Sequence, residues 1–590
     1  MKLEKGNVKR CGLFLYFDKQ GIVDDYISYM LNDLKKSVDY LLVVCNGYIE
    51  RKSLKKLQDC SDEVLCRANV GFDLGGYREG LFYLGWKQLE QYDEIVMMNY
   101  TFFGPLYPFS EMFDAMAEKD VDFWGVTKHH KVEPDPFGQI PYGYLPEHLQ
   151  SHLIVVRRSL FMSYQYRDFM INRKNPANYT EAICTYEAIF TKVFSDLGFT
   201  WDVYMDTSDL EGVFYYPVMF AARDAIENRR CPVIKRRSFF TSYDDFLLNT
   251  CGEATTEAYD YLMEHDLYDL NLIWDNILRL ENLTAIHRSL HLNYMLESYH
   301  TDFAWNKKVA VVLIADDAKH PFFYRRYLAS MPEWADVHLY GKKENCTEIS
   351  KMWEEKGNIK IYPLETESYT ETLLAAAKDL KDCSYDYVGV ARLRDFNKKQ
   401  PYSNEISWQK GDWDNLYGNR NICGNLLQFF EKNPRMGMCI PPIPRHGSLF
   451  AKTQSNWCGR FLEVKEYLDG KAVTVNVNQE ENPLMPFGGS FWIRGTLMSE
   501  LPAYMEGLDE ELALMVLPLV LQHLKFYTGI AYSDRYTSVP ITNQDYMLRE
   551  NNRQLFRKYG PSYHVIVRHR LLTDDLTAGE EWIEKDSSQE

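Results

Sequence analysis

The chain has 590 residues, of which 46% are hydrophobic and 25% charged, so it can bury a sizeable globular core. A net charge of −18 at pH 7 argues against nucleic-acid binding and against broad binding to anionic lipid. Twelve cysteines without CxxC pairs argue against a zinc site or a disulfide framework. The first ten residues lack an apolar run and no stretch is long enough for a membrane helix, so we expect a cytoplasmic protein.

The first half alternates apolar runs with amphipathic segments, a pattern that predicts a mainly parallel sheet with helices on both faces. Strands are expected at 11–17, 40–45, 64–66, 95–98, 123–127 and 148–156, and helices at 24–34, 53–57, 77–89, 112–117 and 185–197.

A different pattern begins near residue 215, where a basic cluster is followed by helical runs such as 270–280 and 286–296. The scheme of strand followed by helix restarts at 309–315 and is repeated three times. We therefore predict an α/β protein with two Rossmann-like sheet domains. The expected boundaries are a first sheet domain, a helical connector, a second sheet domain and a C-terminal tail at 1–214, 215–306, 307–550 and 551–590.

The segment 92–105 is the strongest candidate for a ligand-binding edge. The apolar run at 95–98 is interrupted by Asn99, Tyr100 and Thr101, and a Gly-Pro pair then ends the element. A buried strand that ends in small polar groups presents ligand-binding atoms at the carboxyl edge of an open α/β sheet.

Five segments in the first half and two in the second resemble the rhamnan synthesis protein F family of bacterial cell-wall and capsular polysaccharide glycosyltransferases. They are FLYFDKQGIVDDYISYML (14–31), RANVGFDLGGY (67–77), YDEIVMMNYTFFGPLYP (92–108), DFWGVT (122–127), HLQSHLIVVRRSL (148–160), NICGNLLQFFEKNPRMGMCIPP (421–442) and MPFGGSFWIRGTL (485–497).

The resemblance implies GT-A-like sheet domains and a nucleotide-sugar donor, typically dTDP-rhamnose. It also implies a lipid-linked glycan acceptor that is extended on the cytoplasmic side. Such an acceptor is consistent with peripheral contact between the protein and the inner face of the membrane. The expected activity is transfer of a sugar, rhamnose by family, to a growing cell-surface polysaccharide, with inversion. The alternative is a catalytically altered scaffold that binds glycan or nucleotide, and a further option is that each half transfers a different sugar.

The family usually shows Asn-Asp-Ser where this chain has Asn99, Tyr100 and Thr101. Carboxylates at such a place commonly hold Mg²⁺ or Mn²⁺ against the donor's diphosphate, and Tyr100 removes that acid, so the metal and its ligands are left open. Without a metal, cations must meet the diphosphate. Arg67 and Arg78 are candidates, and surface ion pairs are the equally good alternative.

The predicted donor-binding residues lie at strand ends and in the Gly-rich turn before a helix. Asp18 follows the first strand, where helix capping is the alternative role, and Asp73 lies in the turn. The full predicted set is Asp18, Arg67, Asn69, Asp73, Asn99 and Thr101. By family position, the residues that line the sugar or acceptor site are Trp124, His148 and Gln150, although Trp124 and His148 would serve equally well in a core.

Glu187 is the predicted catalytic base. The run 186–199 resembles the acid-bearing helix of inverting GT-A enzymes, and a carboxylate at a helix N-terminus stays ionised, as a base must. The alternative is a first-turn Glu favoured by the helix dipole alone. The basic cluster 229–237 has no acid within it, which suits an anionic headgroup or diphosphate, or simply a solvated face.

Overall fold

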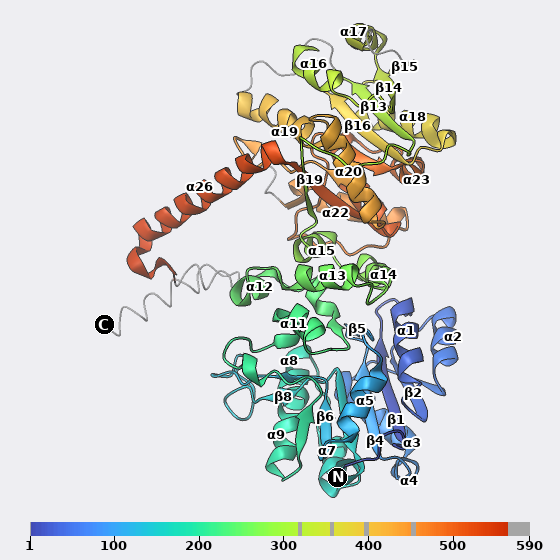
Figure 1. The fold of residues 1–590 in the computed structure, drawn as a ribbon, viewed down its shortest axis with the longest axis vertical. Coiled ribbons are helices and arrows are strands. Elements are labelled where there is room, and N and C mark those ends of the chain that lie inside the picture. Colours follow the sequence, from blue (N-terminus) through green and yellow to red (C-terminus); the bar gives the residue numbers. More distant parts are fainter. Residues whose placement is uncertain (1, 317–320, 354–358, 395–400, 450–455, 565–590) are drawn as a thin grey trace. The chain divides into compact units, whose positions relative to one another are not determined.

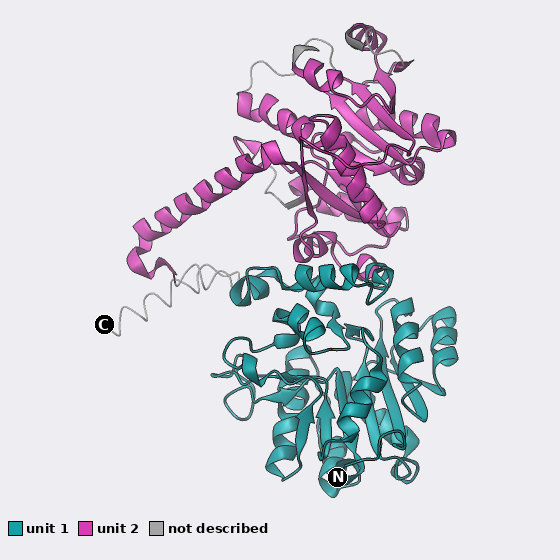
Figure 2. Cartoon of the chain, in the orientation of Figure 1, with its two compact units in different colours: residues 1–276 teal, residues 277–590 magenta. Residues whose placement is uncertain are grey.

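The computed structural model describes residues 2–316, 321–353, 359–394, 401–449 and 456–564. The chain divides into two compact units, Met1–Asn276 and Ile277–Glu590, and each is described by itself (Figure 2).

Unit 1 is built on a seven-stranded sheet of order β10-β6-β9-β4-β1-β2-β3 (Figure 1). β4, β1, β2 and β3 run parallel, β9 is antiparallel to both β4 and β6, and β10 is parallel to β6. The strands of this unit are β1 (Arg10–Phe17), β2 (Tyr40–Asn46), β3 (Glu63–Arg67), β4 (Glu94–Asn99), β5 (Phe102–Phe103), β6 (Phe123–Gly125), β7 (Lys128–His129), β8 (His148–Leu149), β9 (Leu153–Arg157), β10 (Trp201–Val203) and β11 (Ile234–Lys235).

Helices cover both faces of this sheet, because β1 and β4 are apolar on both sides. Leu13 and Leu15 of β1 pack with residues of α3, α7 and α9, whereas Phe113 of α5 packs against Trp124 on the other side. The helices are α1 (Asp25–Leu34), α2 (Arg51–Cys60), α3 (Phe72–Leu84), α4 (Trp86–Leu89), α5 (Phe109–Ala117), α6 (Arg158–Phe161), α7 (Tyr164–Asn172), α8 (Tyr179–Ala182), a π-helical turn (Ile183–Glu187), α9 (Ala188–Asp196), α10 (Pro217–Phe220), α11 (Ala222–Glu227), α12 (Tyr243–Asn249), α13 (Ala254–Glu264) and α14 (Leu270–Leu280).

Unit 2 carries an eight-stranded sheet of order β12-β19-β17-β18-β16-β13-β14-β15. From β19 to β15, its sequence of parallel and antiparallel pairs is the same as that from β10 to β3 in unit 1. The strands are β12 (Asn293–Leu296), β13 (Val309–Ala315), β14 (Ala335–Gly341), β15 (Ile359–Pro363), β16 (Tyr387–Leu393), β17 (Met436–Ile440), β18 (Phe491–Arg494) and β19 (Tyr527–Ser533).

The helices of unit 2 connect these strands and end in one long C-terminal helix, α26. They are α15 (Leu283–Ser289), α16 (Pro321–Ala329), α17 (Lys343–Trp353), α18 (Tyr369–Leu380), α19 (Ile406–Leu416), α20 (Arg420–Lys432), α22 (Phe461–Gly470), α23 (Gly495–Met498), α24 (Leu501–Met505), α25 (Glu510–His523) and α26 (Asp534–Tyr559).

The predicted mixed α/β architecture with sheets of parallel strands is confirmed. Two local expectations need correction. The segment 148–156 is not one strand, because a turn at 150–152 separates β8 from β9. The segment 215–306 contains helices but also β11 and β12, which join strands of unit 1 and unit 2 respectively. Among the described residues, each helix is too short or too polar to cross a membrane.

Candidate functional site

The carboxyl ends of the parallel strands in unit 1 meet at one edge of the sheet, as the sequence predicts. Asp18 follows β1, Asn46 ends β2, Arg67 ends β3 and Asn99 ends β4. Since β1 is paired with both β2 and β4, these polar residues lie along the same edge. We therefore expect a ligand-binding site at this edge.

Two carboxylates at this edge are linked through a single serine. Asp73 Oδ2 accepts hydrogen bonds from Asn99 Nδ2 (2.9 Å) and from Ser151 Oγ (3.2 Å). The backbone N–H of Ser151 donates to Glu187 Oε1 at 3.1 Å. Three predicted residues, Asp73, Asn99 and Glu187, are thus brought together, and the turn after β8 supplies Ser151.

Ser151 was missed from the sequence, although it lies directly beside the selected Gln150. The serine acts on Glu187 through its backbone amide and on Asp73 through its hydroxyl. The amide role carries no side-chain signature, and a single serine forms no motif.

The environment of Asp73 disfavours its charge. Burial raises the pKa of Asp73 to about 6, and the negative charge of Glu187 adds to the effect, while the hydrogen bonds from Asn99 and Ser151 oppose it. A carboxyl group with a pKa near 6 can exchange a proton close to neutral pH.

Glu187 lies inside a helix and not at its start. The helical segment begins at Tyr179, where the Asn178 side chain caps it by accepting from the Glu181 N–H, and it passes through a π-helical turn that ends at Glu187. The expected helix start at 185 is therefore wrong, and the argument that a helix N-terminus keeps Glu187 ionised is lost with it. Single π-helical turns inside α-helices are frequent at functional sites.

A lysine that the sequence argument placed in the connector also reaches this edge. Lys235 lies on β11, which pairs antiparallel with β5, so that Lys235 faces Phe102 across the pair. Its ammonium lies 3.5 Å from Thr101 Oγ1. Burial lowers the pKa of Lys235 to about 8, while the carboxylates of Glu187 and Asp73 oppose the shift.

The arginines expected to meet a diphosphate are engaged elsewhere. Arg67 donates to Glu79 (2.6 Å), Asn46 (2.6 Å) and the Val70 carbonyl (2.8 Å), which fixes the loop before α3. Arg78 donates to the carbonyl oxygens of Met170 and Arg173 and to the Asn175 side chain. Both arginines are thus tied to neighbouring chain segments.

The other predicted donor-binding residues, Asp18, Asn69 and Thr101, differ in their exposure and in their hydrogen-bond partners. Asp18 Oδ1 accepts from the N–H groups of Gln20 (2.9 Å) and Ile22 (3.1 Å), so it stabilises the turn after β1. Asn69 is exposed. Thr101 donates from its hydroxyl and its N–H to Asn99 Oδ1, at 2.7 and 3.1 Å, and so shapes the end of β4.

Tyr100, at the position where the resemblance led us to expect an acid, packs its ring edge-to-face against Tyr16 with ring centroids 5.7 Å apart. Burial raises the pKa of Tyr100 to about 12, and the charge of Asp73 adds to the shift. The phenol therefore keeps its proton at neutral pH.

The predicted sugar or acceptor residues are all buried. Trp124 has no exposed surface and donates from Nε1 to Glu94 Oε1 at 3.1 Å, which makes it a core residue. His148 stacks on His129 with ring centroids 5.2 Å apart, and burial lowers its pKa to about 4. Gln150 is 3% exposed, and its Oε1 has no hydrogen-bond partner among the described residues.

The donor set at this edge does not fit a hard divalent cation. In the described part of the chain, no group of three or more His, Cys, Asp or Glu side chains is placed to hold a metal ion. Asn99 Oδ1 already accepts from Thr101, and the ammonium of Lys235 lies close enough to Asp73 and Glu187 to act on both carboxylates. A cation such as Mg²⁺ prefers several free oxygen ligands without a competing positive charge.

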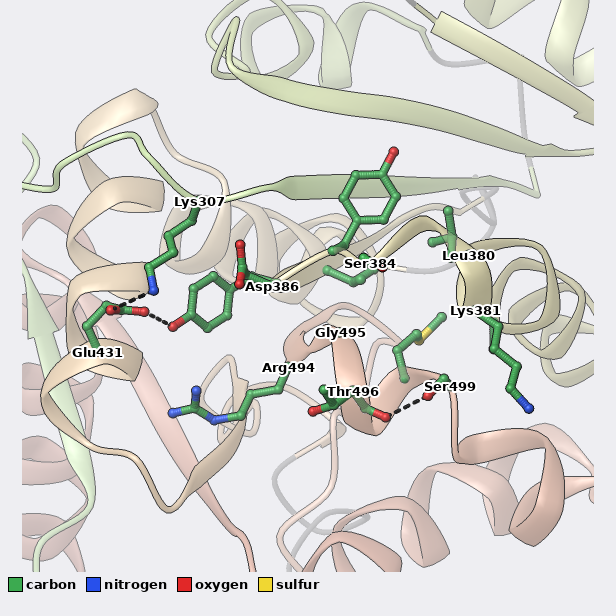
Figure 3. Close-up of a pocket in the computed structure, with 15 residues that line it drawn as sticks. Lys307, Leu380, Lys381, Ser384, Asp386, Glu431, Arg494, Gly495, Thr496 and Ser499 are labelled. Atoms are coloured by element: carbon green, nitrogen blue, oxygen red, sulfur yellow. Dashed lines mark hydrogen bonds and ion pairs between the residues drawn. The ribbon is translucent and has the colours of Figure 1, made fainter.

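A separate cavity of about 470 Å³ lies in unit 2, at the edge of the unit 2 sheet where β16 begins and β18 ends (Figure 3). This edge is opposite the carboxyl ends of the parallel strands of that sheet. Three of its charged side chains are engaged: Lys307 contacts Glu431 at 3.2 Å, and Arg494 donates to the carbonyl oxygens of Met436 and Phe430.

A curated protein resembles part of this chain. A curated relative, the uncharacterized protein y4gN of Sinorhizobium fredii (strain NBRC 101917 / NGR234), is 24% identical over 192 residues, which are 32% of this chain. The match spans about half of that relative, 46% of its length.

Two solved structures show only a distant likeness. The glycosyltransferase GlyE of Streptococcus pneumoniae TIGR4 has 11% identity and a TM-score of 0.24, with 68% of this chain and 91% of that chain covered. Core-mannan synthase A of Aspergillus fumigatus, in its Mn/GDP form, has 9% identity and a TM-score of 0.17, with 28% and 63% covered. TM-scores this low do not establish a shared fold.

The family model described as rhamnan synthesis protein F matches residues 41–513 and thus most of the 590 residues. The match includes Asp73, Asn99, Ser151, Glu187 and Lys235. The chain belongs to the rhamnan synthesis protein F family.

Proposed function

We propose that this protein is a glycosyltransferase of polysaccharide synthesis that acts at the carboxyl edge of the GT-A-like sheet of unit 1. The donor is a nucleotide sugar, dTDP-rhamnose by family, and the acceptor is a growing, lipid-linked surface glycan. Family membership supports the reaction class, and the observation that carries the site is the pair of carboxylates, Asp73 and Glu187, held by Ser151.

The proposed reaction is a single displacement with inversion. Glu187 accepts the proton of an acceptor hydroxyl, whose oxygen attacks the anomeric carbon of the sugar. The bond between that carbon and the diphosphate oxygen breaks, and the nucleoside diphosphate leaves with the electron pair. Alignment of the two reactants and charge stabilisation of the leaving group account for most of the rate in such a step.

Asp73 is proposed to position the site. Its hydrogen bonds to Asn99 and Ser151 fix the end of β4 and the turn that supports Glu187. Mg²⁺ or Mn²⁺, where bound in related enzymes, supplies charge to the diphosphate. The donor set described above does not favour such an ion here, so the proposed steps use only residues of this chain.

The Glu187→Gln variant tests the function. It keeps the acceptor for the Ser151 N–H but cannot take a proton, so turnover should fall by about 10²–10⁴-fold. Donor affinity, measured by calorimetry with a nucleotide-sugar panel, should stay within a factor of about three of wild type. Glu181→Gln, in the first turn of the same helical segment, is the matched control and should keep full activity.

Two results would contradict the proposal. If wild-type protein neither bound nor turned over any nucleotide sugar, with or without Mn²⁺, the transferase function would be rejected. If a donor bound but wild type and Glu187→Gln both failed to transfer sugar, the catalytically altered scaffold would replace it.

A further inference from the structure

The basic cluster 229–237 contains arginines with acidic partners and one lysine without such a partner. Arg229 forms ion pairs with Asp209 (2.7 Å) and Asp224 (2.6 Å), and Arg230 pairs with Glu111 at 2.8 Å. Arg237 lies 3.8 Å from an oxygen of Asp245. These three arginines are therefore neutralised by acids from outside the cluster, and their role is structural.

Lys235 has no such partner. Among the described residues no carboxylate lies within ion-pair distance of its ammonium, and its closest polar contact is the 3.5 Å approach to Thr101 Oγ1. The carboxylates of Asp73 and Glu187 act on it from beyond that distance. An unpaired ammonium that is largely shielded from water is costly unless an anion compensates it.

Buried polar atoms without partners lie around the same place. His152 is only 2% exposed, yet neither of its ring nitrogens has a hydrogen-bond partner among the described residues. Its carbonyl accepts from the Asn99 N–H (3.0 Å), its ring packs against Phe102 (5.5 Å), and the charge of Lys235 acts on it. Buried polar groups are nearly always satisfied, so the two His152 nitrogens are available to hydrogen-bond a ligand or a water molecule at this edge.

The neighbouring backbone holds Lys235 close to the end of β4. The N–H of Arg236 donates to the carbonyl of Thr101 at 3.2 Å, and β11 is paired with β5 directly after that residue. Lys235 therefore lies beside the Asn99–Thr101 segment, where Tyr100 stands in place of the acid that the resemblance predicts.

We propose that Lys235 is the cation that binds the diphosphate of the donor at this edge, in place of a divalent metal ion. The inference rests on the proposed function, because it assigns the leaving-group half of the same site. A lysine ammonium is a compact point charge with three N–H donors, which suits a phosphate oxygen. The ligand class is a nucleoside diphosphate, either free or as the leaving group of a nucleotide sugar.

Binding of free nucleoside diphosphates tests this role without requiring turnover. Isothermal titration calorimetry would use dTDP, UDP and GDP on the full chain, each in EDTA and in Mn²⁺. We expect one of them to bind in EDTA and Lys235→Met to weaken that binding at least tenfold. Lys235→Arg, which keeps the charge, should lose less. The uncharged nucleoside should bind wild type and Lys235→Met equally.

Arg230→Met is the matched control, since it removes a cation of the same cluster that is already paired with Glu111. It should bind the diphosphate like wild type. Thermal melting of each variant identifies loss of folding, and Lys235→Gln provides a second neutral variant if Lys235→Met does not fold.

The outcomes separate this inference from the proposed function. Equal diphosphate affinity of wild type and the neutral Lys235 variants, or binding that requires Mn²⁺, would overturn the role of Lys235 and leave the transferase intact. Failure of all three diphosphates to bind wild type in either medium, together with failure to bind or turn over any nucleotide sugar, would overturn both.

Discussion

Asp73 is held in an environment that favours its protonated form, and this has a measurable effect on stability. Its pKa rises from an ordinary value of 3.8 to about 6 on folding. Between these two pH values the folded state binds more protons than the unfolded state, so stability falls as pH rises from about 4 to 6 and is level above that. The raised pKa of Asp73 therefore lowers the unfolding free energy at pH 7.5 by at most about 3 kcal/mol.

Asp73→Asn should therefore stabilise the protein at pH 7.5 while reducing turnover. The amide avoids the buried charge, and its oxygen can still accept from Asn99 or Ser151. We expect a melting temperature higher than that of wild type at pH 7.5 and a smaller difference at pH 4.5, as measured by scanning calorimetry. An equal difference at both pH values would mean that the pKa of Asp73 is not raised on folding.

Residues at strand ends could be predicted from the sequence, because a strand followed by a turn fixes where its last side chains lie. Asp73, Asn99 and Glu187 are of this kind, or lie on the helices that return to the same edge. Lys235 could not be predicted, because a two-residue pairing between β11 and β5 joins segments more than 130 positions apart. Trp124 was selected by family position, and its burial depends on Glu94 and Phe113, whose contacts with it the sequence does not reveal.

At the scale of elements, the short pair of β5 and β11 is what brings Lys235 to the site. Gly104 follows β5 with a positive φ of 157°, and a Cβ at this position would lie 2.6 Å from the carbonyl oxygen of Pro232. That oxygen belongs to the backbone that leads into β11 and also accepts from the Leu106 N–H. The close approach of the two segments therefore requires glycine.

Gly104→Ala should displace the Pro232–Lys235 segment and lower diphosphate affinity in the calorimetric assay at least severalfold, besides costing about 1–3 kcal/mol of stability. Gly198→Ala is the control: this glycine also has a positive φ, 91°, but no atom lies within 4 Å of its Cβ position. It should lose stability and keep affinity. Unchanged affinity in Gly104→Ala would show that β11 does not depend on this contact.

The helix that carries Glu187 shows why element boundaries were harder to predict than element types. The apolar spacing after residue 185 correctly predicts an amphipathic helix, and Ile189, Phe190 and Phe194 are buried. The preceding turn is short and has no buried residue, so periodicity does not reveal it, and only the Asn178 cap marks the true start. A π-helical turn is likewise invisible to a pattern with a period of 3.6 residues.

At the scale of the whole molecule, the same strand order in both units makes their carboxyl edges comparable. Asp316 follows β13 as Asp18 follows β1, and Glu510 lies on the helix before the last parallel strand, as Glu187 does in unit 1. The two edges differ in charge pairing. In unit 2, Arg392 contacts Asp316 (2.5 Å) and both oxygens of Glu510 (2.6 and 3.0 Å), so both acids are occupied. This arrangement favours a structural role for that edge and does not favour a second transfer reaction.

Removal of the shared arginine tests the structural role. The Arg392 side chain is 6% exposed and also lies 4.4 Å from the centre of the Tyr369 ring. Arg392→Met leaves Asp316 without its ion-pair partner and leaves Glu510 with only the 3.6 Å contact to Arg394. Because Asp316 and Glu510 remain partly exposed, we expect a loss of about 2 kcal/mol. Hydrogen–deuterium exchange should increase in β13 and β16, while β1 and β4 exchange as in wild type and diphosphate affinity stays unchanged. Adding Glu510→Gln should restore part of the stability, since it removes one of the two charges that Arg392 compensates. Wild-type exchange in β13 and β16 together with lost sugar transfer would instead identify the edge of unit 2 as a working site.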